Sequence, residues 1–155
     1  MTIYIDMDGV LAEWNADATI EDTKKRGYFS KRKPEPSIVD LIKALKKLEA
    51  HVCILSAVYQ NGYAAVEKSE WLDAIVGDDV DRIFVPYGED KSDYISGGKG
   101  NILIDDFSEN LRAWEQSGNV GVKFYNGING TKGSWKGRFI RKGMSIGEMI
   151  AALVT

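Results

Sequence analysis

The sequence contains only one cysteine and one histidine, and it has no long apolar run. A single cysteine, Cys53, cannot form an internal disulfide, which is typical of proteins in a reducing cytoplasm. No stretch approaches the roughly 20 apolar residues that a membrane span needs, and no signal-peptide pattern precedes the first apolar residues. We therefore expect a cytoplasmic protein without a membrane partner. Neither Cys53 nor His51 has a sequence neighbour that indicates nucleophilic or metal chemistry.

A strong excess of one charge is also absent. The chain has 20 basic and 23 acidic residues, a net charge of −3, which argues against general attraction to nucleic acid or to a membrane surface. We expect no stable nucleic-acid partner. A length of 155 residues is enough to bury a core and is typical of one domain. The sequence therefore predicts a single domain over residues 1–155, and it carries no signal for the oligomeric state.

Short apolar runs alternate with helical patterns along the chain. The runs predict strands at 3–5, 52–55, 82–85, 102–104 and 120–125, and apolar spacing predicts helices at 36–48, 63–76, 110–116 and 144–154. Such alternation is typical of a parallel sheet with helices on both faces. We therefore expect an α/β fold with a Rossmann-like three-layer arrangement. In the helix at 63–76 the expected buried face consists of Val66, Trp71, Leu72 and Ile75.

Two segments depart from this alternation. Residues 13–33 are polar, basic and aromatic, and residues 127–142 are rich in glycine and show no clear periodicity. The glycine-rich part contains no phosphate-loop motif, since no Gly-Lys-Ser or Gly-Lys-Thr follows it. We expect residues 127–137 to form a long surface loop that borders the site described next.

Polar side chains of complementary type follow four of the predicted strands. In open parallel sheets, ligands bind at the edge where the carboxyl ends of the strands meet. Each residue alone has an ordinary explanation as a turn, cap or solvent-exposed residue, but their occurrence together in this order indicates a functional site. The residues are Asp6 and Asp8 after the first strand, Ser56 after the second, Lys91 after the third, and Asp105 with Asp106 after the fourth.

This set of side chains suits phosphoryl transfer. Hydrolysis of phosphate monoesters is among the slowest uncatalysed reactions, and a carboxylate nucleophile divides it into two easier steps. Attack of a carboxylate on a phosphate dianion is repulsive, so the aspartates need a hard cation such as Mg²⁺, and Lys91 supplies a further positive charge. Ser56 can donate a hydrogen bond to the phosphate. The second aspartate of the first pair can exchange a proton with the leaving group and with water.

The same residues resemble, in order, the four motifs of the haloacid-dehalogenase-like (HAD) phosphohydrolase superfamily. The matching segments are Asp-Met-Asp-Gly-Val at 6–10, Ile-Leu-Ser at 54–56, Lys91, and Ile-Leu-Ile-Asp-Asp at 102–106. The resemblance implies that Asp6 is the nucleophile and that Asp8 is the acid and base. It also implies a Mg²⁺ ion held by the Asp6 carboxylate, the Asp8 backbone carbonyl and Asp106, with Asp105 binding the ion or orienting a bound water. Because the dehalogenase branch lacks the second aspartate, Asp8 indicates phosphate chemistry.

A finer resemblance is to the 5′(3′)-deoxyribonucleotidases of this superfamily. It rests on residues 6–12, 26–29 and 103–106, and on the glycine-rich loop with Trp135 beyond it. These enzymes remove phosphate from deoxynucleoside monophosphates with Mg²⁺, and they carry a small helical cap after the first motif, where residues 13–35 lie in this chain. Ala57 departs from the pattern, because the family commonly has a small hydroxyl residue there. By this resemblance the expected partner is a small phosphorylated substrate, namely a nucleotide.

The segment at 13–35, called the cap segment below, admits two interpretations. Trp14, Tyr28 and Phe29 can stack on a nucleobase, which stabilises binding by ~1–3 kcal/mol per base, or they can pack the cap onto the core. The basic runs at 24–26 and 31–33 can attract a phosphorylated substrate, although a solvent-exposed face is the more ordinary explanation of such runs.

Two other functions remain open at this point. A small cap leaves an open site, which admits nucleic-acid ends or another phosphorylated metabolite as the substrate. A phospho-acceptor switch similar to response-regulator receivers also combines clustered aspartates, a hydroxyl and a lysine. In a receiver the acidic pair comes first and the acceptor lies in the middle of the chain, whereas here the candidate acceptor Asp6 comes first and the acidic pair comes last. The order of the motifs therefore favours an enzyme.

Overall fold

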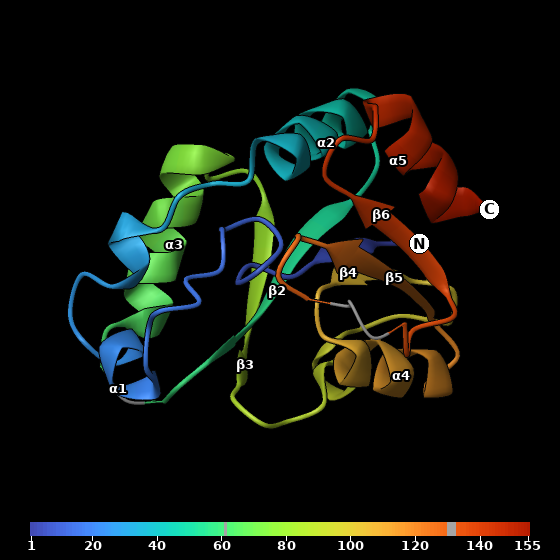
Figure 1. The fold of residues 1–155 in the computed structure, drawn as a ribbon. Helices are drawn as coiled ribbons and strands as arrows, with labels where there is room; N and C mark the ends of the chain where they lie inside the picture. The colour runs from blue at the N-terminus through green and yellow to red at the C-terminus, as the bar shows by residue number, and fades with distance from the viewer. Residues whose placement is uncertain (61, 130–132) are drawn as a thin grey trace.

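The computed structural model describes residues 1–60, 62–129 and 133–155. Within these residues, six parallel strands form a sheet in the order β3-β2-β1-β4-β5-β6 (Figure 1). This is the strand order of a doubly wound Rossmann-like sheet, so the predicted fold class is confirmed. The strands are β1 (Ile3–Ile5), β2 (Val52–Val58), β3 (Asp81–Pro86), β4 (Ile102–Asp105), β5 (Val120–Tyr125) and β6 (Arg138–Arg141).

Helices cover both faces of the sheet. In Figure 1, α2 and α5 lie together on one face and α4 lies on the opposite face. None of the helices in the described ranges is long and apolar enough to cross a membrane. The α-helices are α1 (Ile20–Thr23), α2 (Pro36–Lys47), α3 (Ala64–Ile75), α4 (Ser108–Gln116) and α5 (Ile146–Val154), and two 3₁₀ turns are η1 (Phe29–Lys31) and η2 (Lys91–Tyr94).

The strand β1 shows how the sequence divides the core. Successive side chains of a strand point to opposite faces, so Ile3 and Ile5 pack with α2 and α5 while Tyr4 packs beneath α4. The rings of Tyr4 and Trp114 meet edge to face with their centroids 5.3 Å apart. Cys53 lies buried in the same cluster as Tyr4, and burial raises the pKa of its thiol to about 11. A buried, protonated thiol fits a role in packing.

Two strands differ from the prediction. The strand β2 continues to Val58 because it pairs with β3 as far as Pro86, so Ser56 lies inside the strand and not at its end. The strand β6 falls in a segment whose sequence showed no clear periodicity. In the expected surface loop at 127–137, residues 130–132 lie outside the described residues, and Trp135 is buried against the α4 cluster.

The helix α3 presents a different face from the one predicted. Trp71 and Leu72 are buried as expected, but Val66 is 62% exposed. The buried positions also include Glu67 and Lys68, whose charged side chains a hydrophobic pattern does not assign to a core. The reason is the neighbour of this face: α3 packs against the cap segment, where the Trp71 indole donates a hydrogen bond of 2.8 Å to the carbonyl of Arg32.

Candidate active site

The candidate site lies at the carboxyl ends of β1, β2 and β4, which are neighbours in the sheet. The chain leaves β1 at Asp6, whose N–H donates to the Ile104 carbonyl of β4 at 2.9 Å. It then turns sharply, and the N–H groups of Gly9 and Ala12 bond to the carbonyls of Ala12 and Met7. This tight turn brings Asp8 back toward β2, so both acids of the first motif face the same space.

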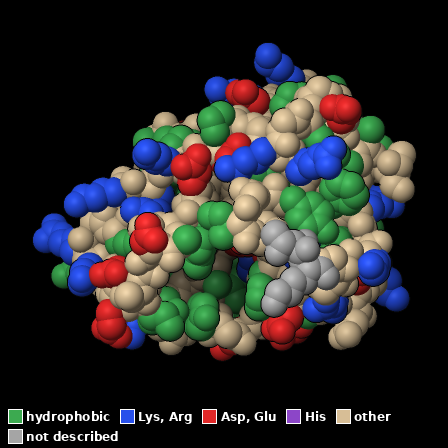
Figure 2. All heavy atoms as spheres, in the orientation of Figure 1, with side chains coloured by type: hydrophobic (Ala, Val, Ile, Leu, Met, Phe, Trp, Pro, Cys, Tyr) green, Lys and Arg blue, Asp and Glu red, His purple; other side chains and the backbone are tan. Residues whose placement is uncertain are grey.

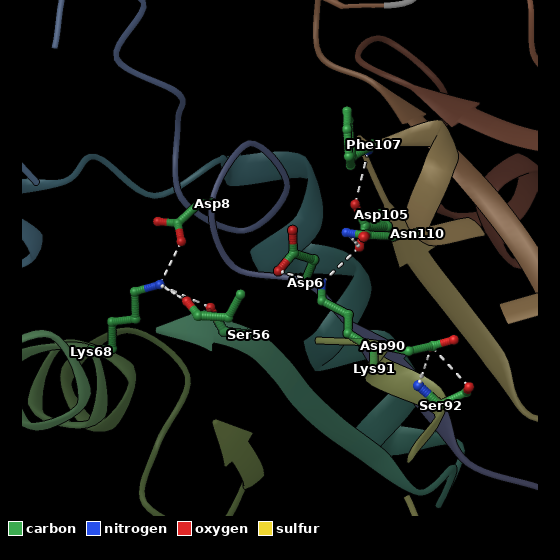
Figure 3. Close-up of polar contacts among 11 residues, drawn as sticks. Asp6, Asp8, Ser56, Lys68, Asp90, Lys91, Ser92, Asp105, Phe107 and Asn110 are labelled. Atoms are coloured by element: carbon green, nitrogen blue, oxygen red, sulfur yellow. Dashed lines mark hydrogen bonds and ion pairs between the residues drawn. The ribbon is translucent and has the colours of Figure 1, made fainter. Parts of the chain in front are cut away.

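One half of the site is built around Lys91 (Figure 3). Its buried ammonium lies 3.0 Å from an oxygen of Asp6 and donates to Asp105 at 2.7 Å. Burial alone acts to lower the pKa of Lys91, but the charges of Asp105 and Asp6 raise it above its ordinary value. Asp105 also accepts hydrogen bonds from the Phe107 N–H at 2.8 Å and from the Asn110 amide at 3.0 Å. These bonds fix Asp105 as a support for Lys91.

The other half is built around Lys68, which the sequence did not indicate (Figure 3). The Lys68 ammonium donates to Asp8 at 2.5 Å, to the Ser56 hydroxyl at 3.0 Å and to the Ala57 carbonyl at 2.8 Å. Its side chain is 1% exposed, whereas that of Asp8 is 28% exposed. One feature of the sequence could have indicated that Lys68 is buried. Lys68 lies four residues after Ala64 and three before Trp71, so all three share one face of α3.

Three carboxylates at this edge are suitable ligands for a metal ion. Asp6, Asp105 and Asp106 each offer an oxygen, and these oxygens lie within 4.8 Å of one another. Burial and the charges of Asp105 and Asp8 raise the pKa of Asp6 to about 7, against the opposing effect of Lys91. Burial and the charges of Asp105 and Asp6 likewise raise the pKa of Asp106 well above its usual range. A hard divalent cation such as Mg²⁺ would relieve this repulsion between oxygen donors.

Acidic groups outnumber basic groups in the site, four carboxylates to two ammonium groups. A divalent cation such as Mg²⁺ would favour the ionised forms of the carboxylates that bind it. The charged groups are Asp6, Asp8, Asp105 and Asp106 on one side and Lys68 and Lys91 on the other.

Two asparagines form hydrogen bonds next to the acidic cluster, which consists of Asp6, Asp105 and Asp106. The Asn126 amide donates to the Gly9 carbonyl at 2.9 Å and lies 3.4 Å from an oxygen of Asp106. The Asn129 amide donates to the carbonyls of Asp106 and Phe124 at 2.8 and 2.9 Å. Both residues follow β5, and Asn129 lies in the segment 127–137 that is predicted to border the site, while Asn126 directly precedes it. The sequence did not indicate these contacts, since an Asn-Gly step is first a turn signal.

Glycine is required at position 9 for two reasons. Gly9 has a φ of +83°, and a Cβ atom there would lie 2.2 Å from an oxygen of Asp106. We expect Gly9→Ala to destabilise the fold by about 1–3 kcal/mol through backbone strain and to weaken Mg²⁺ binding by displacing Asp106. Chemical denaturation and a Mg²⁺ titration measure the two effects. Gly98→Ala is the matched control, because Gly98 has no neighbour within 4 Å and no positive φ. Equal behaviour of the two variants would contradict the close-packing argument.

A pocket of about 730 Å³ connects the acidic cluster with the cap segment. Its lining includes Asp6 and Asp8 together with the three predicted aromatics Trp14, Tyr28 and Phe29. The face drawn in Figure 2 is hollowed, and hydrophobic side chains border the hollow. Phe29 packs in a buried cluster with Val58 and Ala64, while the side chain of Trp14 is 51% exposed.

Two residues of the basic runs in the cap segment form ion pairs on the surface. Lys24 pairs with Glu21 at 3.3 Å and Lys25 with Asp22 at 2.7 Å, both within one exposed helical turn. The Arg32 guanidinium lies 4.4 Å from the ring centroid of Tyr28, which lines the pocket. Arg32 is therefore the member of these runs that is best placed to act on a ligand.

Comparison with known proteins finds similarity at the level of structure. No protein-family model and no curated protein matches the sequence. D,D-heptose 1,7-bisphosphate phosphatase from B. bronchiseptica, solved with magnesium and phosphate, superimposes with a TM-score of 0.54 at 18% identity over 79% of each chain. DsGPDH of Dunaliella salina superimposes with a TM-score of 0.59 at 16% identity over 97% of this chain and 28% of that one. The chain therefore shares its α/β fold with both proteins. It spans only 28% of the length of DsGPDH.

Proposed function

We propose that this protein is a HAD-like, Mg²⁺-dependent phosphomonoesterase that acts through an aspartyl-phosphate intermediate. The observation that carries the proposal is the convergence of Asp6, Asp8, Lys91 and Asp106 in the lining of one pocket at the carboxyl edge of the sheet. The phosphatase likeness supports it, because that protein has the same fold and was solved with magnesium and phosphate.

In the proposed reaction Asp6 attacks the phosphorus atom. A bond forms between an Asp6 oxygen and phosphorus while the bond to the leaving oxygen breaks, and Asp8 gives its proton to that oxygen. Asp8 then accepts a proton from water as the water attacks the aspartyl-phosphate, which releases inorganic phosphate and restores Asp6. Lys91 holds the phosphate oxygens. Ser56, predicted from the sequence to bind the phosphate, is fully buried and does not line the pocket; its hydroxyl accepts from Lys68, which also donates to Asp8, so Ser56 helps to fix Lys68 beside Asp8. When bound, Mg²⁺ neutralises charge on the phosphate, and Asp6, Asp106 and the Asp8 carbonyl would hold it.

We propose deoxynucleoside monophosphates as the substrate class. A pocket of about 730 Å³ is of the size that holds a drug-sized ligand, and its apolar lining suits a flat aromatic group. Trp14, Tyr59 and Tyr87 line it, and Tyr87 is 64% exposed. A sugar phosphate is the second candidate, favoured by the likeness to a heptose bisphosphate phosphatase. A sugar ring would cover these rings less completely than a flat nucleobase, which stacks over its whole face.

A panel of phosphorylated compounds tests this function. With Mg²⁺ we expect phosphate release from p-nitrophenyl phosphate and from dUMP and dTMP, with a higher kcat/KM for the nucleotides than for hexose phosphates. EDTA should abolish release and added Mg²⁺ should restore it, because the neighbouring carboxylates of Asp6, Asp105 and Asp106 otherwise repel one another and the phosphate. Activity that is indifferent to EDTA would contradict the metal, and preference for sugar phosphates would contradict the substrate class. A stable phosphorylated protein without turnover would favour the switch.

A further inference from the structure

We infer that Glu67 is a positioning residue that couples the cap segment to the proposed acid and base, Asp8. The inference rests on the proposed function, since it concerns proton transfer to the leaving group. Glu67 and Lys68 are adjacent in α3, and both are buried. One of them reaches the cap segment and the other reaches Asp8.

Glu67 binds the backbone of the cap segment. Its carboxylate accepts hydrogen bonds from the N–H of Gly27 at 2.5 Å and from the N–H of Phe29 at 3.3 Å. Gly27 has a φ of +85°, a left-handed conformation that favours glycine, and its N–H and that of Phe29 bond to the two oxygens of the same carboxylate. No basic side chain of the described residues forms an ion pair with Glu67, so these N–H groups are its principal partners. A buried carboxylate is costly without such donors, and therefore the docked position of the cap segment is favoured.

The hydrogen bonds from the cap segment to Glu67 hold the ring of Phe29 above Lys68, the next residue of α3. The Lys68 ammonium lies 4.5 Å from the ring centroid of Phe29, while it donates to Asp8 at 2.5 Å and to Ser56 at 3.0 Å. Phe29 in turn packs against Val58 and Ala64. The ring covers Lys68 and excludes water from it, which strengthens the hold of Lys68 on Asp8. A displaced cap segment would expose Lys68 and loosen the orientation of the acid.

The test compares substrates that differ in their need for an acid. Departure of p-nitrophenolate needs little proton donation, whereas departure of a nucleoside hydroxyl depends on it. In Glu67→Gln, an amide replaces one acceptor oxygen with a donor that faces an N–H group. We expect the ratio of kcat/KM for dUMP to kcat/KM for p-nitrophenyl phosphate, which reports the phosphoryl transfer to Asp6 and not the shared hydrolysis step, to fall about tenfold, part of the 10²–10⁴-fold effect typical of general acid catalysis. Glu70→Gln, an exposed change on the same helix, is the matched control and should leave the ratio unchanged.

Two further variants keep the inference open to refutation. Phe29→Leu removes the ring above Lys68 and should lower the same ratio, even if Glu67→Gln fails to fold. In a Lys68→Met background, Glu67→Gln should lower the ratio no further, because the coupling passes through Lys68. An equal loss for both substrates, or a ratio that stays constant in Glu67→Gln and Phe29→Leu, would overturn the inference. A wild-type protein that hydrolyses neither substrate would instead refute the proposed function.

Discussion

Replacing Asp6 with asparagine is expected to abolish phosphate release from every substrate. The asparagine would keep the shape of the side chain but could not form an acyl-phosphate by nucleophilic attack. Asp105 cannot replace it, since its carboxylate is held by Lys91, Asn110 and the Phe107 N–H. The loss of kcat should be about 10⁴-fold or more, the scale of removing a nucleophile from a working site. Steady-state assays with p-nitrophenyl phosphate and dUMP measure it.

The same variant should remain folded, which separates catalysis from stability. Because the pKa of Asp6 is raised to about 7 by burial and by the neighbouring acids, its ionised form is a source of strain in the absence of Mg²⁺. We expect the unfolding midpoint of Asp6→Asn in EDTA to equal or exceed that of the wild type. Asp78→Asn, at an exposed position, controls for the loss of one charge. Near-normal turnover by Asp6→Asn would refute the nucleophile assignment.

The position of the candidate site could be predicted from the sequence, because the carboxyl ends of parallel strands all meet at the same edge of the sheet. Each strand that ends in an acid delivers that acid to the same edge, and the contacts of Lys91 with Asp6 and Asp105 link three separate segments there. The fold class followed in the same way, since strands buried on both faces appear as continuous apolar runs. These inferences need only local patterns and the general handedness of the fold.

The contacts made by α3 could not be predicted by such reasoning. Glu67 and Lys68 occupy a face that looks polar in the sequence, and only the docking of residues 27–32 makes that face an interior one. The pattern therefore selected Val66, which points outward. The strand β6 was missed for a related reason: four residues with two arginines carry a weak strand signal, and pairing with β5 supplies the rest.

The second large effect is expected from Lys91→Met. Lys91 separates two acids, and its removal leaves Asp105 fully buried and Asp6 nearly so, without a positive partner. Breaking a buried ion pair by removing one partner typically destabilises a protein by about 3–5 kcal/mol. We expect a loss of this size in urea denaturation with EDTA present. Mg²⁺ should restore more stability to the variant than it adds to the wild type, because the ion then neutralises acids that lack their lysine.

Lys68→Met is the matched comparison for Lys91→Met. Both lysines are buried and both contact an aspartate, but Asp8 is 28% exposed and can be hydrated when its lysine is lost. Lys68→Met should therefore lower the free energy of unfolding by about 1–3 kcal/mol, the range for an unsatisfied polar group. Mg²⁺ should restore little of this stability. Activity should fall in both variants, by about 10²–10³-fold in Lys91→Met if the ammonium stabilises charge on the transferred phosphoryl group. If Lys91→Met proved as stable as Lys68→Met in EDTA, Lys91 would not be the counter-charge of the acidic cluster, and the assignment of that cluster to a metal and a phosphate would fail with it.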